Sequence, residues 1–406
     1  MSKDSKGRKK VRQRWYQIIL LKLAGLFYGA HLKNKYGFSI PRDKRVDLDE
    51  PFIIMSNHLT DNDMVFLVNA SKKPLFFVCS EHLARAKGGS KLLLKLFNPI
   101  LMFKGSIGMG TTREILERLR DGNNICIFPE GSRTFDGRTN PIAHSTGKLV
   151  KMAGCALVTF HMEGGFFVQP RWAKTWRKGP ISGGIVNVYS KEQLKDMSSE
   201  EVYEAIVKDI AEDAYARQKM KPAKYTGDRL AEGLENVFYI CPKCHKYETI
   251  KTEDDRFFCS CGLTGKYDEY GFISSPDVPW TTIPEWMDWE SEEFDRRYDD
   301  PADPMSFSNE GATLIEIGRD HSEKVLAEGT FYGDRNGFKI GDYSFDYLDM
   351  EGTEYINLGN TFLFAINKIY YSVTADYLGG VKYRKLYIRK KEEQMLATGK
   401  NFDIAK

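Results

Sequence analysis

Two polar stretches that lie far apart in the chain carry residue types capable of acid–base chemistry. His58 and Asp63 follow one short apolar run, and Glu130 and Arg133 follow another. A carboxylate bound to one nitrogen of an imidazole fixes its tautomer and supports the imidazolium that forms when the other nitrogen takes a proton. A guanidinium offers a planar fork that fits phosphate. Because the motif of His58 and Asp63 contains no nucleophilic serine, we expect the nucleophile to be a hydroxyl of the substrate.

Two strand ends have to bring these residues together. The apolar runs 52–55 and 125–128 predict buried strands, Pro129 ends the second, and Gly131 lets the backbone turn. Ligands of α/β sheets usually lie at the carboxyl ends of strands, so we expect one common cleft. Further apolar runs alternate with helical segments up to residue 220, which predicts a layered α/β domain. These are the strands Leu75–Cys79 and Ala156–Phe160 and the helices Asp63–Asn69, with Asn62 as its N-cap, Thr112–Arg120 and Glu200–Lys219.

Several polar side chains near these motifs allow more than one interpretation. Arg133 can bind phosphate or form an ion pair with Glu130. Lys104, in a loop that contains glycine, is a second phosphate ligand or lies in an ordinary surface turn. His161 with Glu163 can line the pocket or simply end a polar strand.

The order and spacing of these motifs resemble the glycerolipid acyltransferases, and above all the 1-acyl-sn-glycerol-3-phosphate acyltransferase type. The resemblance covers residues 15–215 and rests on Asn57-His58-x-x-x-x-Asp63 and Phe128-Pro-Glu-Gly-Ser-Arg133. Lys104 stands about where the family has an arginine, and Arg113 is the alternative, although we expect it on a helix face.

This resemblance implies a role for each motif residue. His58 would deprotonate a glycerol hydroxyl, Asp63 would orient His58, and the hydroxyl would attack the thioester of acyl-CoA or acyl carrier protein. Glu130, Gly131 and Arg133 would form the acceptor site, with Arg133 on the phosphate. The family is associated with membranes.

Four of the seven cysteines cluster in the short segment 236–273. Four thiolates at their spacing suit a tetrahedral, structural zinc ion, and a segment this small needs metal to fold. The segment resembles a zinc ribbon. Iron is the alternative metal, and His245 is the alternative ligand. The predicted ligands are Cys241, Cys244, Cys259 and Cys261.

The N-terminal segment 1–39 combines basic and apolar residues. Apolar side chains recur at helical spacing from Trp15 to Lys33, over a length that is short for a bilayer span. We expect an amphipathic helix that lies in the headgroup region of an anionic membrane or packs on its own domain. The basic tail before it can bind anionic lipid or nucleic acid, or remain disordered.

The length of 406 residues indicates two or three domains. After the tail and helix of 1–39 we predict an acyltransferase domain over 40–222, the zinc ribbon over 236–273, an acidic linker over 274–310 and a mostly-β module over 311–395. The remaining cysteines are scattered, which indicates a reducing compartment.

The sequence therefore predicts an α/β acyltransferase, peripheral or monotopic on the cytoplasmic face of a membrane. Its expected partners are anionic lipid, a lysophospholipid, and acyl-CoA or acyl carrier protein, with structural Zn²⁺ in the ribbon. A non-catalytic lipid-binding scaffold is the alternative. Nucleic acid is not an expected partner, because the acidic segment 285–303 lies beside the ribbon.

Overall fold

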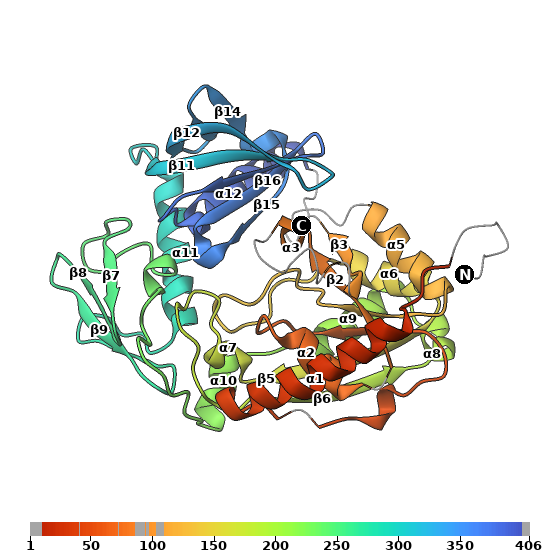
Figure 1. Ribbon diagram of the computed structural model, residues 1–406. Coiled ribbons are helices and arrows are strands. Elements are labelled where there is room, and N and C mark those ends of the chain that lie inside the picture. Colours follow the sequence, from red (N-terminus) through yellow and green to blue (C-terminus); the bar gives the residue numbers. More distant parts are fainter. Residues whose placement is uncertain are drawn as a thin grey trace. The chain divides into compact units, whose positions relative to one another are not determined.

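The computed structural model describes residues 10–39, 41–71, 73–85, 94, 97–102 and 109–399. The chain divides into two compact units (Figure 1). Unit 1 is built from the chain up to Thr226, apart from two short segments. Unit 2 contains one of these segments, Arg171–Thr175, and the chain from Gly227 onward.

A six-stranded sheet forms the centre of unit 1. Its strands are β1 (Phe52–Ser56), β2 (Leu75–Ser80), β3 (Ile100–Met102), β4 (Asn124–Ile127), β5 (Ala156–Glu163) and β6 (Ser182–Tyr189). Their order is β3-β2-β4-β1-β5-β6, with every pairing parallel except that of β6 with β5. The layered α/β prediction and its four predicted strands are confirmed. The short β3 and the glycine-containing, polar β6 were not predicted.

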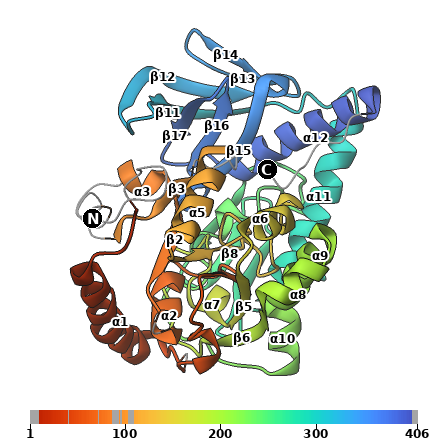
Figure 2. The same ribbon diagram turned by 90° about the vertical axis from the view of Figure 1, so that its right-hand side faces the viewer.

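Helices pack on both sides of this sheet (Figure 2). One core cluster joins Ile53 and Met55 of β1 to apolar side chains of α5, α6, α8 and α9, while α1 and α2 lie on the other side. β1 is buried along its whole length, as expected for a strand covered on two faces. The helices of unit 1 are α1 (Trp15–Tyr36), α2 (Asp63–Ala70), α3 (His82–Arg85), α5 (Met109–Arg120), α6 (Ser145–Ala153), α7 (Gly165–Val168), α8 (Lys191–Asp196), α9 (Ser199–Ile210) and α10 (Ala214–Met220).

Helix α1 approaches α2 through small residues and exposes several of its large apolar side chains. Gly25 and Gly29 approach Asn69 of α2 so closely that an added Cβ would lie 2.6 Å and 2.3 Å from that side chain. Trp15 and Phe27, by contrast, are 74% and 69% exposed. The other exposed apolar side chains of α1 are Ile19, Leu23, Leu26 and Tyr28. Among the described helices, none has the length and hydropathy needed to cross a bilayer.

Unit 2 contains two antiparallel sheets and the helices α11 (Ile283–Asp299) and α12 (Gly380–Thr398). The smaller sheet has the order β10-β9-β8-β7 and the larger the order β14-β13-β12-β11-β17-β16-β15. The strands of the smaller sheet are β7 (Ile250–Glu253), β8 (Arg256–Cys259), β9 (Thr264–Tyr267) and β10 (Ile273–Ser274). The strands of the larger sheet are β11 (Phe307–Ile317), β12 (Glu323–Gly333), β13 (Gly337–Ile340), β14 (Tyr343–Asp346), β15 (Met350–Ile356), β16 (Thr361–Ile366) and β17 (Ile369–Thr374). These seven strands confirm the β-rich C-terminal module, and α12 adds a helix that was not predicted.

The structure replaces the expected acidic linker over 274–310 with a helix. Thr282 and Glu285 form a capping box at the start of α11. Trp286, Phe294 and Tyr298 then recur at helical spacing and are buried in the core of unit 2. The capping box was the sequence signal that could have revealed this helix.

The acidic side of α11 has a basic counterpart in α12. Lys385 lies 3.1 Å from Asp295, and Arg389 lies 2.6 Å from Asp299. Asp295 and Asp299, two acids of the run that suggested a linker, therefore form ion pairs between α11 and α12.

Candidate active site

The two predicted motifs meet at one edge of the sheet of unit 1. β1 and β4 are parallel neighbours, with Met55 opposite Ile127, so the residues after both strands emerge side by side. The backbone N–H of Thr134 donates to the carbonyl oxygen of His58 at 3.2 Å. The motif residues, distant in sequence, therefore share a hydrogen-bonded pair of loops.

Asp63 holds the imidazole of His58 in a defined orientation. His58 Nδ1 lies 2.8 Å from Asp63 Oδ2, and Asp63 is fully buried at the start of α2. The same carboxylate accepts bonds from the backbone N–H of Leu59 at 2.6 Å, the N–H of Thr60 at 3.0 Å and the hydroxyl of Thr60 at 2.6 Å. Asn62 stands at the predicted N-cap position, but its side chain makes no capping bond. Asp63 therefore organises this turn.

One face of the His58 imidazole is covered by another ring, and the side chain is partly exposed to solvent. Its ring stacks on Phe128, with the centroids 4.4 Å apart and the planes 19° apart. The side chain of His58 remains 23% exposed. Since Nδ1 donates to Asp63, Nε2 is the nitrogen that can accept a proton.

Glu130 braces the two loops instead of pairing with Arg133. Its Oε1 accepts the backbone N–H of His58 at 2.7 Å, and its Oε2 accepts the backbone N–H of Asn140 at 2.7 Å. Burial raises the pKa of Glu130 to about 8, although these two N–H groups act in the opposite direction. Gly131, with φ of 71°, makes the left-handed turn that follows.

Arg133 belongs to a ring of hydrogen bonds that the sequence did not predict. Its Nε lies 3.1 Å from Asp61 Oδ1, and its Nη1 donates to the carbonyl oxygen of Gln169 at 3.1 Å. Gln169 Nε2 in turn donates to Asp61 Oδ2 at 2.6 Å. Asp61 lies between the two recognised motif positions, and Gln169 follows α7, so spacing alone gave no signal for either.

Asn57 extends the pairing between β1 and β5 with its side chain. Its Nδ2 donates to the carbonyl oxygen of Met162 at 2.8 Å, and its Oδ1 accepts the N–H of Met162 at 2.8 Å. The carboxamide thus imitates a peptide group, and it fixes the point at which the His58 loop leaves the sheet.

Comparison with known proteins finds a family match within unit 1. The family model for acyltransferases matches residues 38–163, which include His58, Asp63, Glu130 and Arg133. This part of the chain is therefore similar to an acyltransferase domain. The resemblance to glycerolipid acyltransferases is thereby confirmed for this part of the chain.

The chain also shows similarity to a solved structure. The crystal structure of 1-acyl-sn-glycerophosphate acyltransferase from Thermotoga maritima aligns with a TM-score of 0.43 and 18% sequence identity. The alignment covers 51% of this chain and 81% of that one. No curated protein sequence matches the chain.

The other predicted polar residues of the acyltransferase domain fall in different places. Lys104 lies outside the described residues. His161 Nε2 lies 3.1 Å from Glu212 and its Nδ1 lies 3.9 Å from Glu163, at a polar strand end. Arg113 lies on the surface of α5 and pairs with Glu117 at 2.9 Å, as expected for a helix face.

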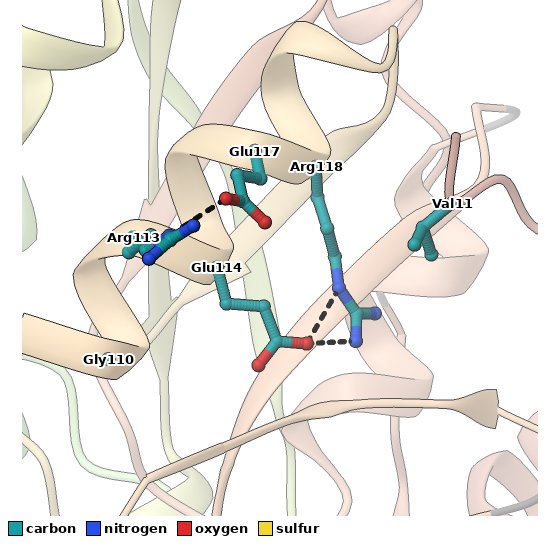
Figure 3. Close-up of a pocket in the computed structure, with 6 residues that line it drawn as sticks. All are labelled: Val11, Gly110, Arg113, Glu114, Glu117 and Arg118. Atoms are coloured by element: carbon teal, nitrogen blue, oxygen red, sulfur yellow. Dashed lines mark hydrogen bonds and ion pairs between the residues drawn. The ribbon is translucent and has the colours of Figure 1, made fainter. Parts of the chain in front are cut away.

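Two cavities of unit 1 lie away from the His58–Asp63 pair. The first measures about 290 Å³ and is lined by Val11, Gly110, Arg113, Glu114, Glu117 and Arg118 (Figure 3). Its charged side chains pair with each other, Arg113 with Glu117 and Arg118 with Glu114. The second measures about 440 Å³ and includes Asn140, whose N–H binds Glu130. Neither is lined by His58 or Arg133.

Four cysteines of unit 2 converge on one point. The sulfur atoms of Cys241, Cys244, Cys259 and Cys261 all lie within 4.8 Å of one another. The closest pairs are 3.6 Å and 3.8 Å apart. Tetrahedral zinc with Zn–S bonds of about 2.3 Å places its sulfurs about 3.8 Å apart, so the cluster fits such an ion. His245, the alternative ligand, pairs through Nδ1 with Glu293 at 3.0 Å.

Proposed function

We propose that the protein transfers a fatty acyl group from acyl-CoA or acyl carrier protein to the free hydroxyl of a lysophospholipid, with 1-acyl-sn-glycerol 3-phosphate as the preferred acceptor. The observation that carries this proposal is the 2.8 Å contact between His58 Nδ1 and Asp63 within an acyltransferase domain. That contact gives the domain a base whose second nitrogen is available.

In this mechanism His58 acts first as a base and then as an acid. Nε2 takes the proton of the acceptor hydroxyl while its oxygen forms a bond to the thioester carbonyl carbon. The tetrahedral intermediate collapses, the carbon–sulfur bond breaks, and the imidazolium returns the proton to the leaving thiolate. Asp63 stabilises the imidazolium between these steps.

The acceptor's phosphate binds at Arg133, on the loop that Glu130 and Gly131 shape. A guanidinium forms charge-assisted hydrogen bonds with phosphate oxygens. Lys104 is the proposed second cation. Replacing Arg133 by Ala should raise the acceptor KM about tenfold or more. An unchanged acceptor KM would count against phosphate binding at this position.

Helix α1 holds the enzyme at the membrane surface, on the cytoplasmic side. Its exposed apolar side chains, among them Trp15 and Phe27, would enter the headgroup region. Basic residues near both ends, including Arg14 and Lys33, would meet anionic lipid headgroups. The Cys241 cluster would hold a structural Zn²⁺.

The test is acyl transfer by a His58→Ala chain. Turnover of lysophosphatidate with acyl-CoA should fall by about 10²–10⁴-fold, while circular dichroism and thermal unfolding remain those of the wild type. His144→Ala is the matched control, because His144 is exposed and pairs with Glu200 at the protein surface. Undiminished turnover by His58→Ala would reject the assignment.

A further inference from the structure

The carboxylate of Asp61 contacts the guanidinium of Arg133, which is the proposed ligand of the acceptor's phosphate. Asp61 lies in the same loop as His58, and its Oδ1 is 3.1 Å from Arg133 Nε. A carboxylate and a phosphate use the same N–H donors of arginine. The pair therefore resembles a binding site that already contains an anion from its own chain.

Arg133 has a second anchor that does not depend on the charge of Asp61. Its Nη1 donates to the backbone carbonyl of Gln169 at 3.1 Å, and Gln169 is buried with 7% exposure. The Arg133 side chain itself is only 16% exposed. Removing the charge at position 61 should therefore leave the guanidinium in place.

Asp61 is placed so that its carboxylate can move away from Arg133. Its side chain is 63% exposed, so rotating the carboxylate into water loses little burial, although it breaks the 2.6 Å bond from Gln169 Nε2. Its backbone N–H, which donates to Gln169 Oε1 at 2.9 Å, keeps the loop attached while the side chain moves.

We propose that Asp61 competes with the acceptor's phosphate for Arg133 and thereby sets the affinity for phosphate-bearing lysolipids. This inference rests on the proposed function, because it takes Arg133 as the phosphate ligand. A phosphate that binds Nε has to displace the carboxylate, and the negative charge of Asp61 opposes its approach. An acceptor without a phosphate does not bind Arg133, so its binding does not require Asp61 to move.

The experiment compares two acceptors with a chain carrying Asp61→Asn. Asparagine keeps the shape of the side chain and an oxygen that can accept the bond from Gln169 Nε2. The KM for 1-acyl-sn-glycerol 3-phosphate should fall about three- to fivefold, whereas the KM for uncharged 1-acylglycerol should not change. Asp49→Asn is the matched control, because it removes another exposed carboxylate, which pairs with Lys73.

An Arg133→Ala background tests whether the effect passes through the guanidinium. If Asp61 competes for Arg133, the effect of Asp61→Asn on the phosphate-bearing acceptor should shrink to the small direct repulsion by its charge once Arg133 is absent, and the uncharged acceptor should again not change. An equal change for both acceptors, or a higher KM for the phosphate-bearing one, would overturn the proposal. The second result would mean that Asp61 holds Arg133 in its binding position.

A binding measurement separates this inference from acyl transfer itself. Isothermal titration of the His58→Ala chain with glycerol 3-phosphate, with and without Asp61→Asn, does not require turnover. Tighter binding to the Asp61→Asn chain supports the competition even if the wild type transfers no acyl group, and in that case only the proposed function fails. Equal binding, or no binding to either chain, overturns the competition whatever the turnover.

Discussion

The carboxylate of Glu130 binds the backbone N–H of His58 at 2.7 Å, and this bond joins two motifs that are 72 residues apart. Its other oxygen binds the N–H of Asn140. The second motif therefore positions the proposed base as well as supplying the proposed phosphate ligand. This dual role explains why an acidic residue lies so close to Arg133 without pairing with it.

Replacing Glu130 by Gln should weaken this brace. In glutamine an NH₂ group replaces one of the two carboxyl oxygens that accept backbone N–H bonds, so a buried hydrogen bond is lost. We expect unfolding free energy to fall by about 1–3 kcal/mol, measured by urea denaturation, together with a lower kcat. Glu192→Gln, at an exposed position in α8, is the control. Wild-type stability and kcat in the Glu130→Gln chain would show that the brace is dispensable.

The same carboxyl group should make stability depend on pH. Burial raises the pKa of Glu130 to about 8, above its ordinary value of 4.5. Between these values the folded chain binds a proton that the unfolded chain has lost, so this contribution to stability falls as pH rises from about 4.5 to about 8. Urea unfolding across that range should show a shallower decline for Glu130→Gln than for the wild type. Identical slopes would contradict the assignment.

Asp63→Asn should impair catalysis more than folding. The amide would accept fewer of the bonds that Leu59, Thr60 and His58 now make to the carboxylate, and it cannot stabilise an imidazolium. We expect kcat to fall about 10²–10⁴-fold at saturating acceptor, with a folded chain by circular dichroism. Asp49→Asn should retain full kcat. A kcat within threefold of the wild type would mean that Asp63 only shapes the turn.

Loss of one cysteine from the cluster should remove the metal and destabilise unit 2. Tyr239 and Ile240 directly precede Cys241 and belong to the same core cluster as Phe294, so the cysteine cluster is joined directly to the core of this unit. Cys259→Ser should lower the bound zinc per chain, measured by mass spectrometry, and lower the Tm. Cys79→Ser, outside the cluster, should leave both unchanged. Full metal content in Cys259→Ser would refute a four-cysteine site.

Substitutions on the exposed side of α1 should weaken membrane binding. Leu26→Ser with Phe27→Ser removes two side chains that are 64% and 69% exposed and so should not affect packing on α2. Flotation with anionic vesicles should show a several-fold loss of bound protein. Met220→Ser, which removes an apolar side chain that is 80% exposed elsewhere in unit 1, is the control. Equal loss for both variants would argue against a specific role of α1.

The sequence by itself predicted the α/β layers, the β-rich C-terminal module and the clustering of four cysteines. Each of these depends on local patterns: apolar runs of strand length, alternation with turn residues, and close ligand spacing. His58, Asp63, Glu130 and Arg133 could be selected as one group because two such runs each end in polar residues. The linker over 274–310 was misassigned because charge was weighed above the capping signal at Thr282.

Only the tertiary structure decided which hydrogen-bond partner each of these residues has. Parallel pairing of β1 with β4 brings the His58 loop next to the Glu130 loop. Two backbone N–H groups then donate hydrogen bonds to the Glu130 carboxyl group. Arg133 consequently meets Asp61 and Gln169, whose separation along the chain gave no hint of contact. The physical reason is that a hydrogen bond depends on where a donor and an acceptor lie in space, and strand order, which no local pattern encodes, sets those positions.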